Sequence, residues 1–448
     1  MEDKNLCMAR QVAEKVAAAG GRTFFVGGYV RDLLLQKENK DIDIEVHGVR
    51  PETLAGILDS LGERMEMGAS FGVFGLRHYN LDIAMPRKEH ATGRGHKDFE
   101  VFVDPFLGTE KAARRRDFTI NALMQDVLTG EIVDHFGGVE DLRKGIIRHV
   151  NDESYAEDPL RVLRAAQFAA RFEFRIDEET LRISGEMDLT SLARERIFGE
   201  LEKALLKAEK PAVFFEILRD MGQLSDWFPE VQALIGVEQD AFFHPEGDVW
   251  NHTMAVLNAA AGLREMAGEP LCFMLSALCH DFGKVTATKV MDGRIRALGH
   301  EKEGVDIAGS FIRRITAETK VKKYVCNMVL LHMRPNLMAD QQSGRKAFAK
   351  VFDRSVSPED LLLLAKADRL GQDRDTGYEV TEAFLKLRLQ EFEELMARPF
   401  VQGRDLLEAG VKPGPLMGEG VKYAHKLRLA GVPKEEALKQ TLSYLRKQ

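Results

Sequence analysis

The order of apolar and polar positions divides the chain into a mixed first part and a helical remainder. Short β-branched or aromatic segments, bounded by Gly, Asn, Asp or Pro, predict strands at residues 23–28, 41–46, 71–76, 81–85 and 99–104. Between them, residues 51–62 follow a helical period, with a proline at the start and a glycine at the end. Residues 1–140 are therefore predicted to form an α+β domain with a small mixed sheet.

From about residue 141 the strand signals fade, and apolar residues recur at the i, i+3, i+4 spacing of helices. This pattern continues to the end of the chain, so the remainder is predicted to be all-α. Breaks in the pattern lie near residues 140, 240 and 375. They predict four parts, which are 1–140, 141–240, 241–375 and 376–448.

Composition narrows the class of protein. The 448 residues are 44% hydrophobic and 30% charged, which is typical of a globular chain with several cores. The four cysteines are scattered without a CxxC pair, which favours reduced thiols inside a cell. No run approaches the roughly 18 uncharged apolar residues of a membrane span, and residues 1–21 lack the apolar core of a signal peptide. A cytoplasmic location without membrane contact is therefore predicted.

Charge is a weak guide to partners. The net charge of −8 argues against nucleic acid, but binding depends on local patches more than on the total. Residues 111–117 are basic, and residues 411–448 hold eight Lys or Arg against three Glu. Local contact with phosphate groups is therefore compatible with an acidic chain.

The segment GGYVRDLLLQKENKDIDIEV at residues 27–46 places a glycine pair before two acids. Because side chains alternate along a strand, Asp41 and Asp43 are predicted to face the same side. Two carboxylates so close repel unless a cation lies between them, and Mg²⁺ binds both carboxylate and phosphate oxygens. Gly27 and Gly28 allow backbone N–H groups to approach a phosphate.

Asp82, in the strand predicted at 81–85, is a third acid that would complete the metal set. Arg31 and Arg87 are candidates to neutralise phosphate charge by bidentate contact. The alternative is a solvated Asp-x-Asp at a strand end, because this pattern alone is weak evidence of function. The role of Glu45 and His47 stays open, and a solvated continuation of the acidic face is the simplest interpretation.

These motifs resemble the opening signature of the class II tRNA nucleotidyltransferases and bacterial poly(A) polymerases, which belong to the DNA polymerase β superfamily. Further segments match that family in order, namely RRRDFTINAL at 114–123, FGGVEDLRKGIIRHV at 136–150, EDPLRVLRAAQFAARF at 157–172 and RERIFGELEKAL at 194–205. The resemblance implies a nucleotidyltransferase head, residues 1–140, and a helical neck, residues 141–240. It also implies transfer of nucleotides from CTP and ATP to tRNA, with Asp41, Asp43 and Asp82 as the catalytic acids around Mg²⁺.

In that family the second motif holds ribose and triphosphate, which implies nucleotide binding by Arg116, Asp117 and Asn121. Residues 88–103 contain glycines and mixed charges, so a mobile loop is expected at least to residue 96. The family associates a flexible loop here with the switch from adding C to adding A. Its presence argues against an enzyme that adds only CC.

The neck motif E-D-x-x-R selects the base in that family, and the resemblance assigns Glu157, Asp158, Arg161 and Arg164 to nucleotide binding. On a predicted helix Asp158 and Arg161 share a face, where Arg donates two parallel hydrogen bonds and Asp accepts one. Such a pair suits the edge of cytosine or adenine. The alternative is an ordinary salt bridge between the two side chains.

Histidines and aspartates in the helical remainder form a second candidate site. His252, His280, Asp281 and Asp368, with His300 and His332 as further candidates, each lie in or beside a predicted helix. Their order resembles the H…HD…D pattern of the HD phosphohydrolase superfamily, which implies an HD domain at 241–375. Imidazole and carboxylate ligands suit a divalent transition metal or Mg²⁺ and the hydrolysis of phosphate esters, and Lys284 is a candidate phosphate contact. Buried structural histidines in a degenerate HD fold are the alternative.

The predicted function is CCA addition to the tRNA 3′ end, with a second phosphohydrolase site that the resemblance associates with 2′,3′-cyclic phosphodiesterase and phosphatase activities. An A-adding tRNA nucleotidyltransferase and a poly(A) polymerase share the head motifs and remain alternatives. An HD phosphohydrolase with a vestigial head is the alternative from another class. The tail, 376–448, resembles the family's tail, and its basic helix is predicted to contact tRNA, with a solvated helix as the alternative.

Overall fold

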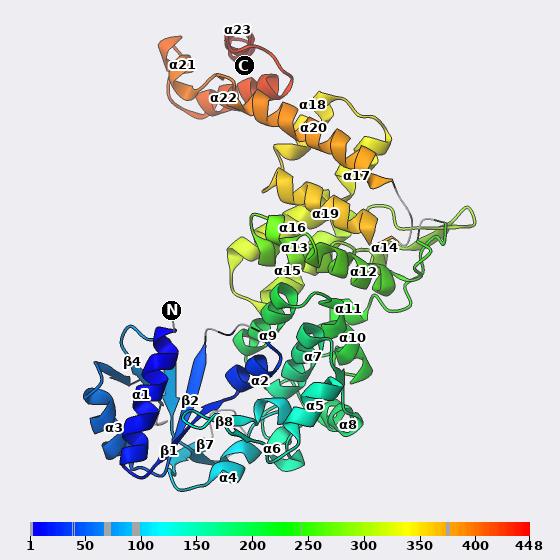
Figure 1. Ribbon diagram of the computed structural model, residues 1–448. Helices are drawn as coiled ribbons and strands as arrows, with labels where there is room; N and C mark the ends of the chain where they lie inside the picture. Colours follow the sequence, from blue (N-terminus) through cyan, green and yellow to red (C-terminus); the bar gives the residue numbers. More distant parts are fainter. Residues whose placement is uncertain are drawn as a thin grey trace. The chain divides into compact units, whose positions relative to one another are not determined.

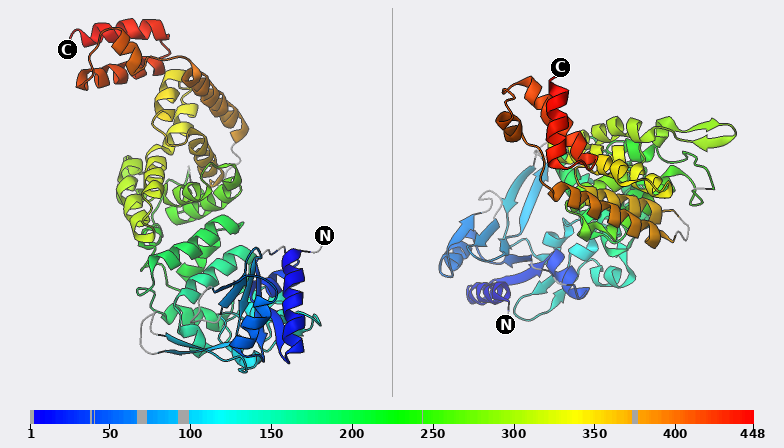
Figure 2. Two further views of the ribbon diagram at one scale, coloured as in Figure 1. Left: turned by 90° about the vertical axis from the view of Figure 1, so that its left-hand side faces the viewer. Right: turned by 90° about the horizontal axis from the view of Figure 1, so that it is seen from above.

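The computed structural model describes most of the chain, namely residues 3–37, 39, 41–66, 73–91, 99–242, 244–372 and 377–448. The chain separates into two compact units (Figure 1, Figure 2). Unit 1 comprises Met1–Ala208 and Val213–Trp227, and unit 2 comprises Glu209–Ala212 and Phe228–Gln448. The finer boundaries near residues 140, 240 and 375 stay predictions.

Unit 1 is built on a seven-stranded mixed sheet with the strand order β3-β4-β5-β2-β1-β8-β9. Its strands are β1 (Arg22–Val26), β2 (Ile42–His47), β3 (Arg64–Glu66), β4 (Val73–Leu76), β5 (Leu81–Ala84), β8 (Met124–Asp126) and β9 (Ile132–Val133). β2 and β5 run parallel, and the other neighbouring strands run antiparallel. The predicted mixed sheet is confirmed, although β2 begins one residue later than expected, so Asp41 lies just before it.

Two helices cover one face of this sheet. α1 (Lys4–Ala18) packs against β1 and β2, and α3 (Pro51–Asp59) packs against α1 (Figure 1). Ile42 and Ile44 on β2 are almost completely buried. Alternation along β2 therefore gives the apolar side chains to the helices and turns the acidic ones to the opposite face.

The opposite face of the sheet carries the polar side chains. α4 (Thr109–Arg114) lies over this face, where its Ala112 packs with Phe24 of β1. Phe24 and Glu45 are direct partners in the β1–β2 register, so Glu45 and Asp43 project from the same face as Phe24. The start of β2 thus brings its acids beside the end of α4.

A separate hairpin joins β6 (Arg87–Ala91) to β7 (Phe99–Val103). The strand expected at residues 99–104 is therefore present. The prediction of a loop directly after Arg87 is wrong for residues 88–91, because these residues belong to β6. Residues 92–98, where the rest of the mobile loop was predicted, lie outside the described residues.

The rest of unit 1 is mainly helical, as predicted. Its elements are α2 (Gly28–Leu34), η1 (Thr119–Asn121), α5 (Gly138–Lys144), β10 (Ile146–Ile147), α6 (Asp152–Ala156), α7 (Leu160–Phe172), β11 (Arg175–Ile176), α8 (Glu178–Glu186), α9 (Arg194–Lys207) and α10 (Ala212–Asp220), the last of which begins at the unit boundary. α7 packs along α9. The parallel pair β10–β11 was not expected, because two-residue strands leave almost no pattern in a sequence.

In its described residues, unit 2 is helical apart from one hairpin. Its helices are α11 (Pro229–Gln232), α12 (Val249–Ala261), η2 (Arg264–Met266), α13 (Pro270–Cys279), α14 (Lys284–Ala287), α15 (His300–Ile315), α16 (Thr319–Leu331), α17 (Met333–Asp340), α18 (Arg345–Phe352), α19 (Pro358–Leu370), α20 (Tyr378–Ala397), α21 (Gly403–Glu408), α22 (Pro415–Leu429) and α23 (Lys434–Leu445). The hairpin consists of β12 (Lys289–Met291) and β13 (Arg294–Arg296) and was not predicted. Among the described residues, no helix is long and apolar enough to cross a membrane.

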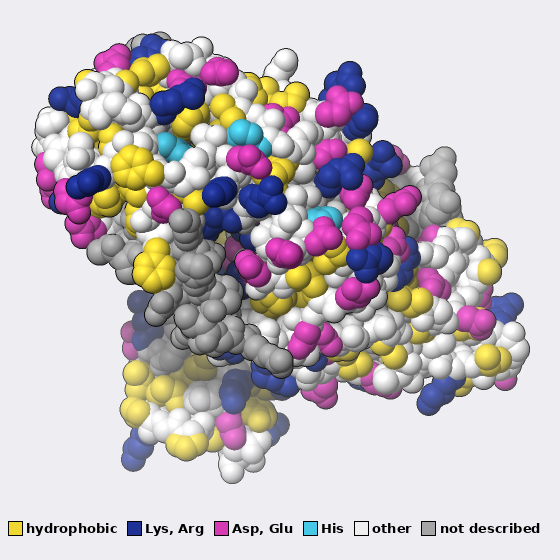
Figure 3. All heavy atoms as spheres, turned by 90° about the horizontal axis from the view of Figure 1, so that it is seen from below, with side chains coloured by type: hydrophobic (Ala, Val, Ile, Leu, Met, Phe, Trp, Pro, Cys, Tyr) yellow, Lys and Arg dark blue, Asp and Glu magenta, His cyan; other side chains and the backbone are white. Residues whose placement is uncertain are grey.

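The surface carries both signs of charge. The chain has 63 Lys and Arg against 71 Asp and Glu. On the face in Figure 3, basic and acidic side chains are interspersed with one another and with hydrophobic ones. Attraction of a polyanion by this face would therefore depend on individual groups and not on a broad field of one sign.

Candidate active sites

A pocket of about 350 Å³ lies on the polar face of the sheet in unit 1. Asp43 on β2 and Asp82 on β5 are direct neighbours in the parallel register, and both line it. Its other lining residues include Val26, Glu45, Ala84, Met85, Arg87, Ala112, Arg115 and Arg116. Two adjacent acids thus face a wall that carries three arginines.

The acids of this pocket repel one another. Burial and the neighbouring charges of Asp82 and Asp41 together raise the pKa of Asp43 to about 6, against the opposing effect of Arg116. Asp41 is exposed, and its Oδ1 accepts a hydrogen bond from Nδ2 of Asn80 at 3.0 Å. A divalent cation bound by carboxylate oxygens would relieve this repulsion, so the donor set fits Mg²⁺.

Glu45 and His47 connect the sheet to Arg116. Nε2 of His47 lies 2.8 Å from Oε1 of Glu45, and Nη2 of Arg116 lies 3.6 Å from Oε2 of the same carboxylate. Burial alone would raise the pKa of Glu45, but His47 and Arg116 hold it below its usual value. Glu45 is 8% exposed, so the interpretation of Glu45 and His47 as a solvated continuation of the acidic face is wrong.

Glycine is required at one turn beside this pocket. Gly27 has a φ of +66°, which side chains other than glycine rarely adopt, and an added Cβ would lie 3.2 Å from Nη1 of Arg116. Gly28 is the first residue of α2, and an added Cβ there would lie 3.4 Å from Nη2 of Arg31. The glycine pair thus lets two guanidinium groups lie close to the backbone.

Arg31 lies inside the fold and not on the pocket wall. It is 4% exposed, and its Nε donates to Oδ1 of Asp32 at 2.8 Å. Its Nη1 donates to Oδ1 of Asn121 at 2.7 Å, and its guanidinium lies over the rings of Phe168 and Phe172. The expectation of an Arg31 open to phosphate is therefore corrected, because its donors are directed at other side chains.

Asp117 joins the head motif to the neck helix α7. Its Oδ2 accepts from Nε of Arg164 at 2.8 Å, and its Oδ1 accepts from Nδ2 of Asn121 at 3.0 Å. Burial alone would raise the pKa of Asp117, but Arg164 and Asn121 hold it below its usual value. With Arg31, which donates to Asn121, the structure thus brings four of the predicted nucleotide-binding residues into one network.

The neck motif differs from its predicted geometry. α7 begins at Leu160, so Asp158 lies before the helix, where its Oδ1 accepts from the Leu160 N–H at 3.2 Å. Its Oδ2 accepts from Nη2 of Arg196 at 2.8 Å, so the alternative of a salt bridge between Asp158 and Arg161 does not form. Arg161 instead donates to the carbonyl of Ser154 and, at 2.8 Å, to that of Arg115.

Two residues of this region were not predicted as site residues. Arg115 lines the pocket and donates to the carbonyl of Arg87 at 2.8 Å, and Arg196 holds Asp158. Both occur within matched motifs, but no spacing rule marks them, because their contacts join distant segments. Glu157 is exposed at the end of α6.

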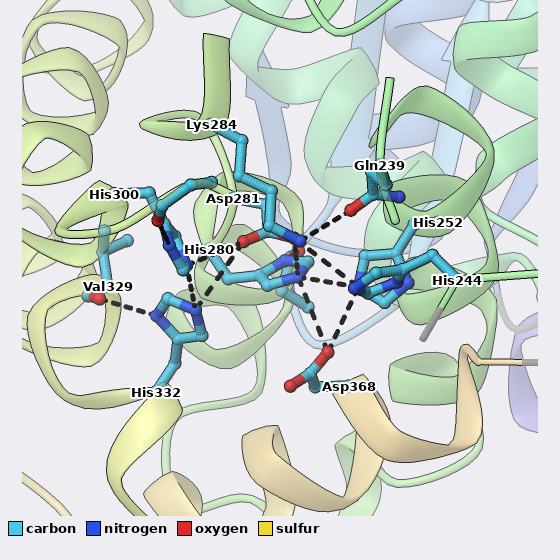
Figure 4. A network of polar contacts seen from close by, with 12 residues as sticks. Gln239, His244, His252, His280, Asp281, Lys284, His300, Val329, His332 and Asp368 are labelled. Carbon is cyan, nitrogen blue, oxygen red and sulfur yellow. Dashed lines mark hydrogen bonds and ion pairs between the residues drawn. The ribbon is translucent and has the colours of Figure 1, made fainter. Parts of the chain in front are cut away.

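The second candidate site gathers six buried side chains from several helices of unit 2 (Figure 4). Their positions are His252 on α12, His280 and Asp281 directly after α13, His300 at the start of α15, His332 directly after α16 and Asp368 on α19. The structure therefore brings together every histidine and aspartate that was predicted for this site.

Asp281 lies at the centre of the cluster, and its two oxygens face different histidines. Oδ2 lies 3.2 Å from Nε2 of His280 and 3.5 Å from Nε2 of His252. Oδ1 lies 3.2 Å from Nε2 of His300 and 3.7 Å from Nε2 of His332. Neither oxygen has an aligned hydrogen bond to a described residue, although Nζ of Lys284 forms an ion pair with Oδ2 at 2.7 Å.

Three of the histidines have their outward nitrogens fixed by the backbone. Each donates from Nδ1 to a carbonyl, namely His280 to Ala277 at 2.8 Å, His300 to Ala297 at 2.8 Å and His332 to Val329 at 2.7 Å. A carbonyl only accepts, so in the neutral form of each ring the Nε2 lone pair faces the cluster. The Nε2 atoms of His300 and His332 are 3.3 Å apart. Such lone pairs beside a carboxylate fit a divalent metal.

His252 is held differently, by residues that the sequence did not single out. Its Nδ1 lies 2.8 Å from Oε1 of Glu246, which also lies 2.8 Å from Nδ1 of His244. Its Nε2 lies 3.1 Å from Oδ1 of Asp368. Burial would lower the pKa of His252, but the contacts with Asp368 and Glu246 raise it to about 9. His244 and Glu246 stand in the same short stretch as His252, which was the only signal available for them.

Three families match the chain. Residues 23–148 match the family described as poly A polymerase head domain, residues 173–235 match the probable RNA and SrmB-binding site of polymerase A, and residues 249–372 match the HD domain. The head match contains the acidic pocket, and the HD match contains the histidine cluster. The fold and its sites define a nucleotidyltransferase of the poly(A) polymerase type joined to an HD domain.

Relatives narrow this class further. The multifunctional CCA protein of Actinobacillus pleuropneumoniae serotype 5b is 36% identical over 362 residues, which cover 78% of this chain and 85% of that protein. The multifunctional CCA protein of Alkalilimnicola ehrlichii is 35% identical over 406 residues, which cover 87% of this chain and 94% of that protein. The chain therefore belongs to the multifunctional CCA protein family.

Solved structures share the fold. The Thermotoga maritima CCA-adding enzyme complexed with tRNA has a TM-score of 0.65 and 22% identity, covering 99% of this chain and 96% of that one. The Bacillus stearothermophilus CCA-adding enzyme in complex with CTP has a TM-score of 0.67 and 20% identity, covering 99% and 98%. At these identities the likeness establishes the fold.

Proposed function

We propose that the chain adds CCA to the 3′ end of tRNA from CTP and ATP, without a nucleic-acid template, in the cytoplasm. The observation that carries this proposal is the pair of neighbouring acids, Asp43 and Asp82, facing three arginines in one pocket. Transfer of a nucleotide needs a site that neutralises a triphosphate and positions a hydroxyl, and these groups supply both. Membership of the multifunctional CCA protein family gives the substrates.

In the reaction, the terminal 3′ oxygen bonds to the α-phosphorus of CTP or ATP, the bond to the bridging oxygen breaks, and pyrophosphate leaves. Asp41 and Asp43, with Asp82, would hold Mg²⁺, which neutralises charge on the triphosphate. Arg87 and Arg116 bind phosphate oxygens, and the Gly27–Gly28 backbone allows their close approach. The contribution of the chain is positioning and charge neutralisation.

The base is read at the start of the neck. Asp158 and Arg161 present hydrogen-bonding groups to the base, with Glu157 exposed beside them. Arg196 positions Asp158 through the contact at 2.8 Å. Arg161 is positioned through the Arg115 carbonyl, which ties base recognition to a residue of the phosphate-binding wall.

Incorporation into three tRNA transcripts tests this function. The transcripts end at the discriminator base, at C and at CC, and each is offered CTP, ATP or both with Mg²⁺. Addition of C, C and A followed by a stop supports the proposal. A single A on the CC-ending transcript alone indicates an A-adding enzyme, a long A tail indicates a poly(A) polymerase, and no incorporation at all contradicts the nucleotidyltransferase assignment.

Glu45 is expected to act as a positioning residue for Arg116. The variant Glu45→Gln removes the charge that faces the guanidinium but keeps the shape of the side chain. Because Arg116 would bind the triphosphate before and during transfer, we expect the KM for CTP and ATP to rise by about tenfold with little change in kcat. Steady-state incorporation measures both, and the exposed Glu52→Gln on α3 is the matched control. A fall in kcat with KM unchanged would contradict this role.

We further propose that the HD cluster is a metal-dependent phosphohydrolase site acting on phosphate esters. Two groups of potential ligands, His252–His280–Asp281 and Asp281–His300–His332, share Asp281, and within each group the ligand atoms lie within 4.8 Å of one another. The inward lone pairs and the unaligned oxygens of Asp281 favour metal binding over a set of structural histidines. A divalent ion there, a transition metal or Mg²⁺, would activate water and polarise the phosphate. Lys284, whose Nζ lies 2.7 Å from Oδ2 of Asp281, is placed to contact that phosphate.

A further inference from the structure

The HD cluster opens into a pocket of about 630 Å³ that has a second set of basic residues. Asp281, Lys284 and His300 form one part of its lining, and Arg294 and Arg296 of the β12–β13 hairpin form another. Pockets for nucleotide-sized ligands span about 300–1,000 Å³, so this one has room for more than a single phosphate group. The hairpin extends beyond the helices of unit 2 next to α14 (Figure 1, Figure 2).

The hairpin presents three cations on one side. In its register Lys289 pairs with Arg296 and Met291 pairs with Arg294, and directly paired residues project from the same face. Like charges that lie directly opposite on two strands destabilise the pairing. A short hairpin gains little from its own pairing, so the repulsion between Lys289 and Arg296 is significant unless an anion binds there.

No acid in the described part of the chain balances the two hairpin arginines. Arg294 and Arg296 are exposed, and neither forms an ion pair or a hydrogen bond from its side chain to a described residue. In contrast, Arg369, on another wall of the same pocket, lies 3.3 Å from Asp340. Among the described residues, none therefore competes with an incoming anion for the hairpin guanidinium groups.

The turn of the hairpin makes this arrangement well defined. Asp292 and Gly293 have φ values of +51° and +71°, as in the type I′ turn that matches the twist of two short strands. Met333 and Leu337 of α17 also line the pocket and give it an apolar face. The pocket lining thus includes metal ligands for one phosphate, arginines for another, and apolar side chains against which a base can pack.

We propose that Arg294 and Arg296 bind the phosphodiester next to the terminal phosphate of an RNA strand, so that the HD site acts on RNA 3′ ends in preference to free nucleotides. This inference rests on the phosphohydrolase function proposed for the cluster. In hydrolysis, water adds to the terminal phosphorus, the bond to the ribose oxygen breaks, and phosphate leaves with a free hydroxyl on the RNA. Because both arginines are exposed, a strand bound by them can continue into solvent.

The test compares substrates that differ in the second phosphate. Phosphate release by the full chain with Mn²⁺ is measured on uridine 3′-phosphate, on uridine 3′,5′-bisphosphate and on a uridine trinucleotide with a 3′-phosphate. We expect the double variant R294A/R296A to lose about 10-fold to 100-fold in kcat/KM on the trinucleotide and less than about twofold on the monophosphate. A variant that changes both substrates equally, or neither, overturns the proposal.

Further comparisons distinguish RNA from a nucleoside bisphosphate as the substrate, and loss of the arginine contacts from a general loss of positive charge. The 5′-phosphate of the bisphosphate stands where the phosphodiester of RNA stands, so the double variant is expected to lose activity on both substrates. A wild-type kcat/KM no higher on the trinucleotide than on the bisphosphate would assign the site to nucleoside bisphosphates and overturn the RNA assignment. The control K346A/K350A removes the same charge from exposed positions on α18 and should leave all three rates unchanged. R294K/R296K should recover part of the loss, because the charge remains while the bidentate geometry does not.

A binding measurement keeps the two proposals distinguishable. If the wild type releases no phosphate from any substrate, the phosphohydrolase function fails. Fluorescence anisotropy with a 5′-labelled trinucleotide 3′-phosphate then decides the inference on the hairpin alone. Weaker binding by R294A/R296A than by K346A/K350A supports it, and equal binding overturns it.

Discussion

Replacing Asp43 by asparagine is expected to reduce nucleotide addition to tRNA by about three orders of magnitude, or ~4 kcal/mol of transition-state stabilisation. Asp43 is the register partner of Asp82 and lines the head pocket together with Arg116, where an amide cannot replace a carboxylate as a metal ligand. The measurement is incorporation of labelled ATP into a CC-ending tRNA transcript at saturating Mg²⁺. Activity within tenfold of the wild type would contradict the proposed metal site.

The same substitution should not unfold the protein. Burial and the neighbouring acids raise the pKa of Asp43 from its ordinary 3.8 to about 6, so at neutral pH the ionised carboxylate destabilises the metal-free fold relative to the unfolded chain. Removal of this charge should therefore leave the melting temperature unchanged or higher. Asp59→Asn is the control, because Asp59 lies on α3 on the other face of the sheet and contacts Arg64. Phosphate release from the HD site should be unchanged in both variants.

The sequence predicted those features that follow from local pattern. The alternation of Asp and Ile along residues 41–46 placed Asp43 on the polar face and Ile44 in the core, because a strand has a period of two. The residue at which α7 begins could also have been predicted from a local rule. The residue before a proline is disfavoured in helical conformation, so Asp158, which precedes Pro159, should have been placed outside the helix.

Features that depend on distant segments were not predictable from one sequence. Arg31 was predicted to bind phosphate, but its partner Asn121 is 90 residues away in the chain. Asp158 is held by Arg196, 38 residues away. A charged side chain is usually exposed, and only the fold shows which ones are buried with partners. The sequence therefore showed that the members of both pairs belong to motifs, but not that they contact each other.

The HD cluster shows the same division between ligands and their supports. The order of histidines and aspartates indicated the inward-facing side chains, because imidazole and carboxylate are recognisable metal ligands. The groups that orient them are backbone carbonyls and Glu246, whose Oε1 lies between His244 and His252. A carbonyl carries no sequence signal, and a glutamate in a loop has no spacing that marks it. Supporting contacts of this kind emerge only from the fold.

Replacing Asp281 by asparagine is expected to abolish phosphate release, with a fall of about three orders of magnitude, and to leave nucleotide addition within twofold. Both oxygens of Asp281 face histidine Nε2 atoms, so the amide would remove the shared ligand of two groups. The metal content of purified protein, measured after dialysis against Mn²⁺, should fall with the activity. Retention of both metal and activity would contradict a centre built on Asp281.

Because Asp281→Asn also leaves Lys284 buried without its carboxylate partner, this variant is expected to lower the free energy of unfolding by about 3 kcal/mol.

A second variant, His332→Gln, tests whether phosphate release can be lost while the protein stays folded. Burial and the nearby His300 and His280 lower the pKa of His332 to about 3, so this ring is neutral and its removal leaves no charge unpaired. A stable His332→Gln protein should still lose metal and phosphate release, while the exposed control Asp306→Asn on α15 keeps both. Full activity in His332→Gln would show that the site works without the group formed with His300. Loss of nucleotide addition in parallel with phosphate release would instead show that the two sites are not independent.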